Sequence, residues 1–196
     1  MNKLTLFILV LLFSFMNVNA QNPLDRSGWA LKTNLLYDLT TTINVGFETR
    51  ISDKMTIDVP VSINPWNKTY GMKLKHLMVQ PEFRYWLNEE FDMHFFGAHV
   101  LYAKYNMADV KLPFNIYEGL KDNQYEGDAI GVGLSYGCHF YINQMLRLEG
   151  TIGFGYIHFK YDKTCLNCEH APISSSKNYF GPTKAGVSLI YMIAWK

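Results

Sequence analysis

Apolar and polar residues alternate along most of the chain with a period of two residues. Such alternation is typical of β-strands with one apolar and one polar face. For example, Ile57, Val59 and Val61 alternate with Thr56 and Asp58. The pattern predicts eight strands, over residues 29–40, 43–50, 55–63, 76–87, 93–105, 127–141, 146–160 and 183–195. No helix of normal length is predicted, although the pattern leaves room for a helical turn at 116–120.

The connections between these strands alternate in length. The second, fourth and sixth strands are followed by short turns, at 52–54, 88–90 and 143–144, and the third, fifth and seventh by long segments, at 64–75, 106–126 and 161–182. Only the first connection, Thr40–Thr42, departs from this rule. Short turns at one end and long loops at the other are typical of outer-membrane barrels. We therefore predict an all-β fold, an eight-stranded antiparallel up-and-down transmembrane β-barrel with both termini at the short-turn end.

The strands at 55–63 and 76–87 contain Pro60 and Pro81, respectively. Proline lacks the backbone N–H that a ladder needs, so it is unfavourable inside a strand. β-Bulges at these two positions would accommodate the prolines.

The N-terminus has the features of a secretory signal peptide. Lys3 precedes an apolar run from Leu4 to Met16, and Val18 and Ala20 stand at the −3 and −1 positions of a cleavage site. We predict a signal peptide over 1–20, a periplasmic N-terminal segment over 21–28 and the barrel over 29–196. An uncleaved N-terminal anchor is the alternative. The rest of the chain contains no apolar run long enough for a transmembrane helix.

Composition narrows the class of protein. The 196 residues suit one domain, and 18 Lys+Arg against 17 Asp+Glu disfavour an electrostatic nucleic-acid binder.

Aromatic residues make up 15% of the chain, and many fall at the ends of predicted strands. Membrane barrels carry aromatic girdles where the wall meets the lipid headgroups. The predicted girdle residues are Trp29, Trp86, Phe140 and Trp195 at the short-turn end, and Tyr156 and Phe159 at the long-loop end.

The polar faces of the strands carry charges of both signs. Eight such residues are predicted to form a polar network inside the barrel: Glu48, Arg50, Asp58, Glu82, Arg84, Arg147, Glu149 and Lys184. Side chains can fill the interior of an eight-stranded barrel, and opposite charges can pair there. The prediction is a plugged interior without a cofactor. A narrow ion or proton path through the network is the alternative.

Several segments resemble a secreted bacterial family, the domain of unknown function 3575. They are residues 31–38 (LKTNLLYD), 80–86 (QPEFRYW), 178–185 (NYFGPTKA), 64–66 (NPW), and 161–163 (YDK) with the following Cys165 and Cys168. The resemblance covers nearly the whole chain after the signal peptide. It implies a small outer-membrane β-barrel, and it implies no activity, substrate or catalytic residue.

Cys165 and Cys168 form a C-x-x-C in a predicted loop. Outside the cytoplasm such a pair favours a local disulfide. Free or redox-active thiols, or a metal bound with His158, Asp162 or His170, are the alternatives. No metal site is predicted, because a structural metal needs about four ligands.

The predicted function is that of a small barrel in the outer membrane of a Gram-negative bacterium, in contact with its lipids. It would support the envelope or dock surface or envelope proteins through loops 106–126 and 161–182. One alternative is an enzyme that modifies lipids of the outer leaflet. The candidate residues at the long-loop end of the barrel form no recognisable motif: Asp38, Glu126, Asp128, His158, Thr183 and Ser174–Ser176. Another is a secreted lipocalin-like barrel, with the apolar face turned inward around a ligand.

Overall fold

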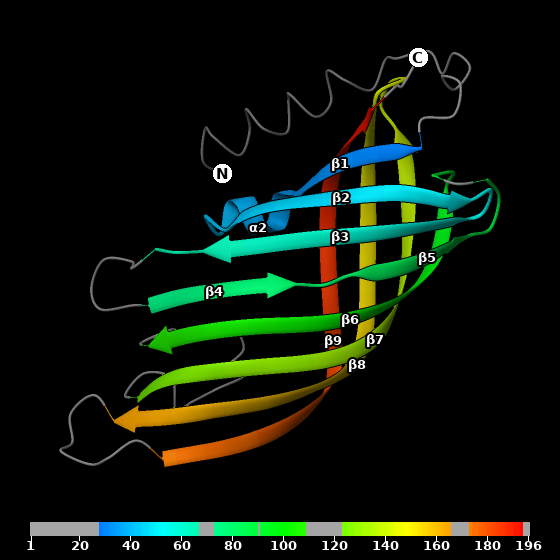
Figure 1. Ribbon diagram of the computed structural model, residues 1–196. Coiled ribbons are helices and arrows are strands. Elements are labelled where there is room, and N and C mark those ends of the chain that lie inside the picture. Colours follow the sequence, from blue (N-terminus) through cyan, green and yellow to red (C-terminus); the bar gives the residue numbers. More distant parts are fainter. Residues whose placement is uncertain (1–27, 67–72, 90, 109–122, 166–172, 194–196) are drawn as a thin grey trace, which may run out of the picture.

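The computed structural model describes residues 28–66, 73–89, 91–108, 123–165 and 173–193. They form an antiparallel sheet that closes on itself, because β1 pairs with both β2 and β9 (Figure 1). Its elements are β1 (Trp29–Asn34), α2 (Leu35–Leu39), β2 (Ile43–Ser52), β3 (Met55–Asn64), β4 (Lys73–Val79), β5 (Glu82–Trp86), β6 (His94–Ala108), β7 (Asn123–Tyr141), β8 (Leu146–Cys165) and β9 (Ile173–Ile193). Since β4 and β5 share one position in the wall, the predicted eight-stranded antiparallel β-barrel is confirmed.

The two prolines act differently. Pro60 lies inside the continuous strand β3, opposite Gly46, and its carbonyl accepts a hydrogen bond from the Gln80 amide. Pro81 divides the expected strand at 76–87 into β4 and β5. The Pro81 carbonyl still accepts a hydrogen bond from the Val100 amide, so the wall continues across the break.

The first expected strand is too long, and a short helix was missed. β1 ends at Asn34, whose side chain accepts a hydrogen bond from the Leu36 amide and caps α2. The first connection therefore spans residues 35–42 and lies at the long-loop end, which removes the exception to the loop-length rule. No helix in the described ranges is long and apolar enough to cross a bilayer.

Strands β6 to β9 extend into the predicted loops. β6 continues to Ala108, and β7, β8 and β9 have 19, 20 and 21 residues. The connections are therefore 109–122 and 166–172, shorter than the expected 106–126 and 161–182. The possible turn at 116–120 and the signal peptide lie outside the described residues. Figure 1 shows these long strands curving behind the first strands of the barrel.

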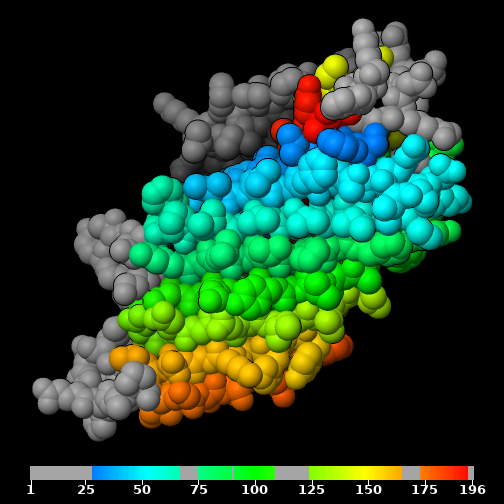
Figure 2. All heavy atoms as spheres, viewed as in Figure 1, coloured from blue at the N-terminus to red at the C-terminus, as the bar shows by residue number. Residues whose placement is uncertain are grey.

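The outward side of the wall is largely apolar, whereas the inward side carries the buried charged residues. Leu134, Ile130 and Phe140 are 70%, 62% and 59% exposed, whereas Glu48 and Arg84 are fully buried. Figure 2 shows the side chains of successive strands packed in continuous bands over one face. The lipocalin-like alternative is wrong in orientation, because it requires the apolar face to point inward.

Candidate functional site: an ion-pair network inside the barrel

Arg84 on β5 is the centre of the interior, and its guanidinium contacts four carboxylates. Nη1 lies 2.9 Å from Glu48 Oε2 and 2.7 Å from Glu149 Oε2. Nη2 lies 2.7 Å from Asp58 Oδ2, and Nε lies 2.6 Å from Glu82 Oε1. All five side chains are at most 3% exposed. A planar guanidinium with five donors suits such a position, because a single ammonium could not reach all four partners.

Two lysines complete the charge pairing. Lys32 Nζ pairs with Glu48 and lies 3.0 Å from Glu149 Oε2. Lys184 Nζ lies 2.8 Å from Glu82 Oε2. The network thus has three fixed cations against four carboxylates, an excess of one negative charge. His139 lies beside the excess charge, with its Nε2 2.8 Å from Glu149 Oε2.

Hydroxyl groups donate further hydrogen bonds to three of the four carboxylates. Thr151 donates to Glu149 Oε1 at 2.7 Å, and Ser135 donates to Glu82 Oε2 at 3.0 Å. Thr56 donates to Glu48 and accepts a hydrogen bond from Trp86 Nε1 at 3.0 Å. Nearly every buried charge therefore has both an ionic and a hydrogen-bonded partner, which offsets much of the cost of taking it out of water.

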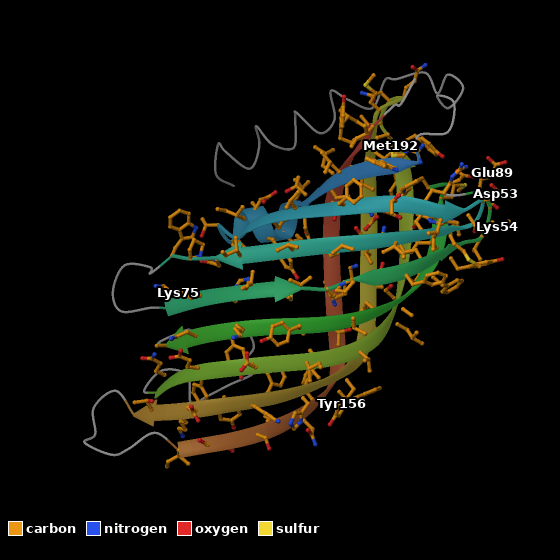
Figure 3. All side chains as sticks on the ribbon, in the orientation of Figure 1. Asp53, Lys54, Lys75, Glu89, Tyr156 and Met192 are labelled. Carbon is orange, nitrogen blue, oxygen red and sulfur yellow. The ribbon has the colours of Figure 1, made fainter. Side chains whose placement is uncertain are left out.

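The network lies between two apolar layers. Towards the short-turn end, a cluster of buried apolar residues fills the interior: Ala30, Trp86, Phe91, Phe95, Ile190 and Met192. Figure 3 shows Met192 at this end, with Asp53, Lys54 and Glu89. Towards the long-loop end lies a second cluster, Leu101, Ala129 and Ile157, against which Tyr105, Phe159 and Tyr179 pack. Apolar side chains of the described chain thus separate the network from the short-turn end, which disfavours an ion path.

A small polar cavity adjoins the network. Its volume is about 40 Å³, and Asp58, Gln80 and Lys184 are among its lining residues. A bulge in β9 turns Thr183 inward, where its carbonyl accepts from Gln80 Nε2 at 3.1 Å. Within the described part of the chain, Asp58 Oδ1 lacks a hydrogen-bond partner. A cavity of this size holds a few water molecules and no larger ligand.

Six of the eight predicted network residues come together, and two do not. Arg50 lies near the short-turn end, where it is 33% exposed and 3.9 Å from the exposed Asp53. Arg147 is buried, but it donates to the Phe91 carbonyl and lies over the Tyr141 ring, away from Arg84. Alternation assigns a residue to a face and gives no height along the barrel, so these two could not be separated from the rest.

Two important partners were missed, Lys32 and His139. Lys32 is on the polar face of its strand, and Lys32 pairs with Gly46 across β1 and β2, next to Glu48. His139 lies opposite Glu149 on β8. In each case the signal was a basic residue on a polar face. Glu149 stands directly opposite His139, and Glu48 is two residues from the position opposite Lys32.

Of the five predicted girdle residues that the structure describes, three lie on the outward face of the barrel. Trp29, Phe140 and Tyr156 point outward and are 50%, 59% and 42% exposed. Trp86 is wrong: it is fully buried, because it shares the phase of Glu82 and Arg84 rather than that of Tyr85. Phe159 is also wrong, because it shares the inward phase of Ile157. Trp195 lies outside the described residues.

The candidate chemistry of the rim does not come together. Ser174 donates to Asp162 at 2.6 Å, and His158 Nδ1 lies 2.7 Å from Asn178 Oδ1, so neither contacts the other. In the interior, Thr183 Oγ1 lies 2.9 Å from His99 Nε2, as a nucleophile beside a base would, but His99 Nδ1 is 3.7 Å from the Glu82 carboxylate. The side chains of Cys165 and Cys168, and with them the predicted disulfide, lie outside what the structure describes.

Comparison with known proteins identifies the family of this chain. The family model described as "Protein of unknown function (DUF3575)" matches residues 5–193. The chain belongs to the DUF3575 family. No curated protein and no solved structure matches it. The segments that resemble this family include Lys32, Glu82, Arg84 and Lys184, so part of the interior network lies within them.

Proposed function

We propose that this DUF3575 barrel resides in the outer membrane, after export through a cleaved signal peptide, as a sealed scaffold with a docking surface at its long-loop end. The observation that carries the proposal is the inverted distribution of side chains. Outward residues such as Leu134 and Phe154 are 70% and 52% exposed, while Arg84 is fully buried. Apolar surface in water costs roughly 25 cal/mol per Å². Hydrocarbon around the barrel removes that cost.

The apolar surface ends at the same level on neighbouring strands, which supports a membrane boundary. On β6 the outward residues from Phe96 to Tyr102 are apolar or aromatic, and Lys104 follows. On β7, which runs in the opposite direction, the next outward residue beyond Ile130 towards the long-loop end is Asp128. Tyr102 pairs with Ile130, Lys104 pairs with Asp128, and the Tyr102 hydroxyl donates to Asp128 at 3.0 Å. This is the arrangement expected where a barrel wall passes from hydrocarbon into headgroups.

The lengths of the last strands support a projecting surface. A strand of about 9–11 residues crosses a bilayer when tilted, whereas β7, β8 and β9 have 19 to 21 residues. Their far ends carry exposed charged residues, among them Glu126, Lys160 and Asp162. We infer that these ends stand clear of the membrane on a rigid base, where binding segments are commonly carried.

The interior supports a structural role rather than catalysis. The ionic groups already pair with one another, and the cavity of about 40 Å³ beside them is too small for a lipid substrate. A buried network of this kind can also impose one register on the strands, because a strand in the wrong register would leave a buried charge without its partner.

Membrane residence is tested by separating the membranes of cells that produce the full chain. The protein should co-sediment with the outer membrane, require detergent for extraction, and migrate faster on gels before boiling than after it. Release into buffer without detergent would contradict the proposal.

Docking is tested by site-specific photo-crosslinking in intact cells. Crosslinkers at Lys75 and Lys54 report on the two opposite ends of the barrel (Figure 3). Specific adducts should form from Lys75 and not from Lys54, and should vanish when 109–122 or 166–172 is replaced by a short Gly/Ser linker that leaves membrane insertion intact. The docking role fails if Lys75 yields no adduct, or the same adducts as Lys54.

A further inference from the structure

The wall of the barrel has an interruption where β1 ends. β1 pairs with β2 only up to Lys32, whereas β2 continues as far as Ile43. On the other side, residues 173–187 of β9 pair with β8 and not with β1. Helix α2 contacts β1, β2 and β9 and occupies this interval. Its Leu36 and Leu39 are 41% and 75% exposed and extend the apolar outer surface across the gap.

A groove lies between α2 and the end of β2 that β1 does not reach. It has a volume of about 520 Å³ and is lined by Asp38, Thr41, Thr42, Ile43, Asn44 and Trp66. Ile43 and Trp66 are 55% and 50% exposed. The Trp66 ring is fixed in place, because its Nε1 donates to the Thr41 carbonyl at 3.0 Å. The groove is therefore an open surface with a polar rim, on which Ile43 and Trp66 continue the apolar outward face of β2.

One end of this groove is acidic. The Asp38 carboxylate accepts from the Thr33 hydroxyl at 2.9 Å and from Asn44 Nδ2 at 2.8 Å. Asn44 is in turn held by the main chain of β1, since it donates to the Asn34 carbonyl. Among the described residues, no cationic side chain contacts Asp38. The two hydrogen bonds hold the Asp38 carboxylate in position. Because Asp38 is also exposed, its carboxylate is accessible from the groove.

We propose that this groove binds a membrane lipid whose headgroup carries a primary ammonium group. The acyl chain lies against Ile43 and Trp66, and the ammonium pairs with Asp38. A carboxylate at the edge of an apolar surface attracts a cationic group and repels an anionic one. Trp66 adds a ring face, on which an ammonium is also attracted. This inference rests on the proposed residence in a membrane.

The test measures lipid retention by the full chain, folded in detergent micelles that contain phosphatidylethanolamine and phosphatidylglycerol with identical acyl chains. Native mass spectrometry should show about tenfold preferential retention of phosphatidylethanolamine, as expected for a hydrogen-bonded ion pair. Asp38→Asn should abolish the preference. Asp53→Asn, which removes an exposed carboxylate at the opposite end, should preserve it.

A second measurement leaves the protein unchanged and alters the lipid. N-acetylation of the ethanolamine removes the positive charge, and the wild-type chain should then retain the lipid about tenfold less well. Equal retention of the native and N-acetylated lipids, or of the two headgroups in the first test, overturns the inference. If the folded protein inserts into membranes and shows no preference, only this inference fails; if it does not require detergent at all, the proposed function fails first.

Discussion

Replacing Arg84 by methionine should strongly destabilise the barrel. The substitution keeps a long apolar stem and removes a cation that lies within 2.9 Å of four carboxylates, each at most 3% exposed. Only Lys32 and Lys184 would remain to balance them. Removing one partner of a buried pair costs about 3–5 kcal/mol, because the other charge is left without compensation. With about 1.4 kcal/mol for each factor of ten, the folding equilibrium should fall by roughly two to four orders of magnitude.

The measurement is a urea titration of the full chain refolded into lipid vesicles, followed by gel migration before and after boiling. The control is Arg50→Met, because Arg50 is 33% exposed and its carboxylate partner Asp53 is 86% exposed; such pairs contribute about 0–1 kcal/mol. Adding Glu149→Gln to the Arg84→Met variant should restore part of the lost stability, since it removes one uncompensated charge. An Arg84→Met loss no larger than that of Arg50→Met would refute the central role of Arg84.

Three further results are expected. Gly133→Ala should destabilise the barrel by about 1–3 kcal/mol in the same titration, because the new Cβ would lie 2.6 Å from a buried imidazole nitrogen and 2.7 Å from a backbone carbonyl oxygen. The control is Gly150→Ala, which should change stability little, because the nearest atom to its Cβ would be 3.9 Å away. Equal effects of the two substitutions would contradict the packing described. Asn44→Ala should lower stability by about 1–3 kcal/mol and hasten proteolysis at α2, because it removes the amide that joins β1 to the helix; unchanged proteolysis would argue against that link. In single-tryptophan variants, brominated lipid should quench the outward Trp29 and spare the buried Trp86, and quenching of both would contradict the inward position of Trp86.

Strand positions could be read from the sequence because period-two alternation is a local property of extended backbone. The same period separated the apolar from the charged residues correctly on β2, β3 and β7, for example Phe47 from Glu48. It failed where local signals compete. Asn34 caps a helix that the alternation through Leu35, Tyr37 and Leu39 had concealed, and Trp86 was assigned by its aromatic nature instead of its phase.

The sequence by itself therefore determined the class of fold, the two faces of each strand and the ends at which short and long connections lie. Only the tertiary structure decided which face is inside and which charged residues meet. Closure of the sheet gives each inward residue a height in the barrel, and that height separates Arg84, with its four carboxylates, from Arg50 at the rim. Height depends on the register between strands far apart in sequence, and contacts such as that of Lys32 with Glu149, 117 residues away, follow from this register alone.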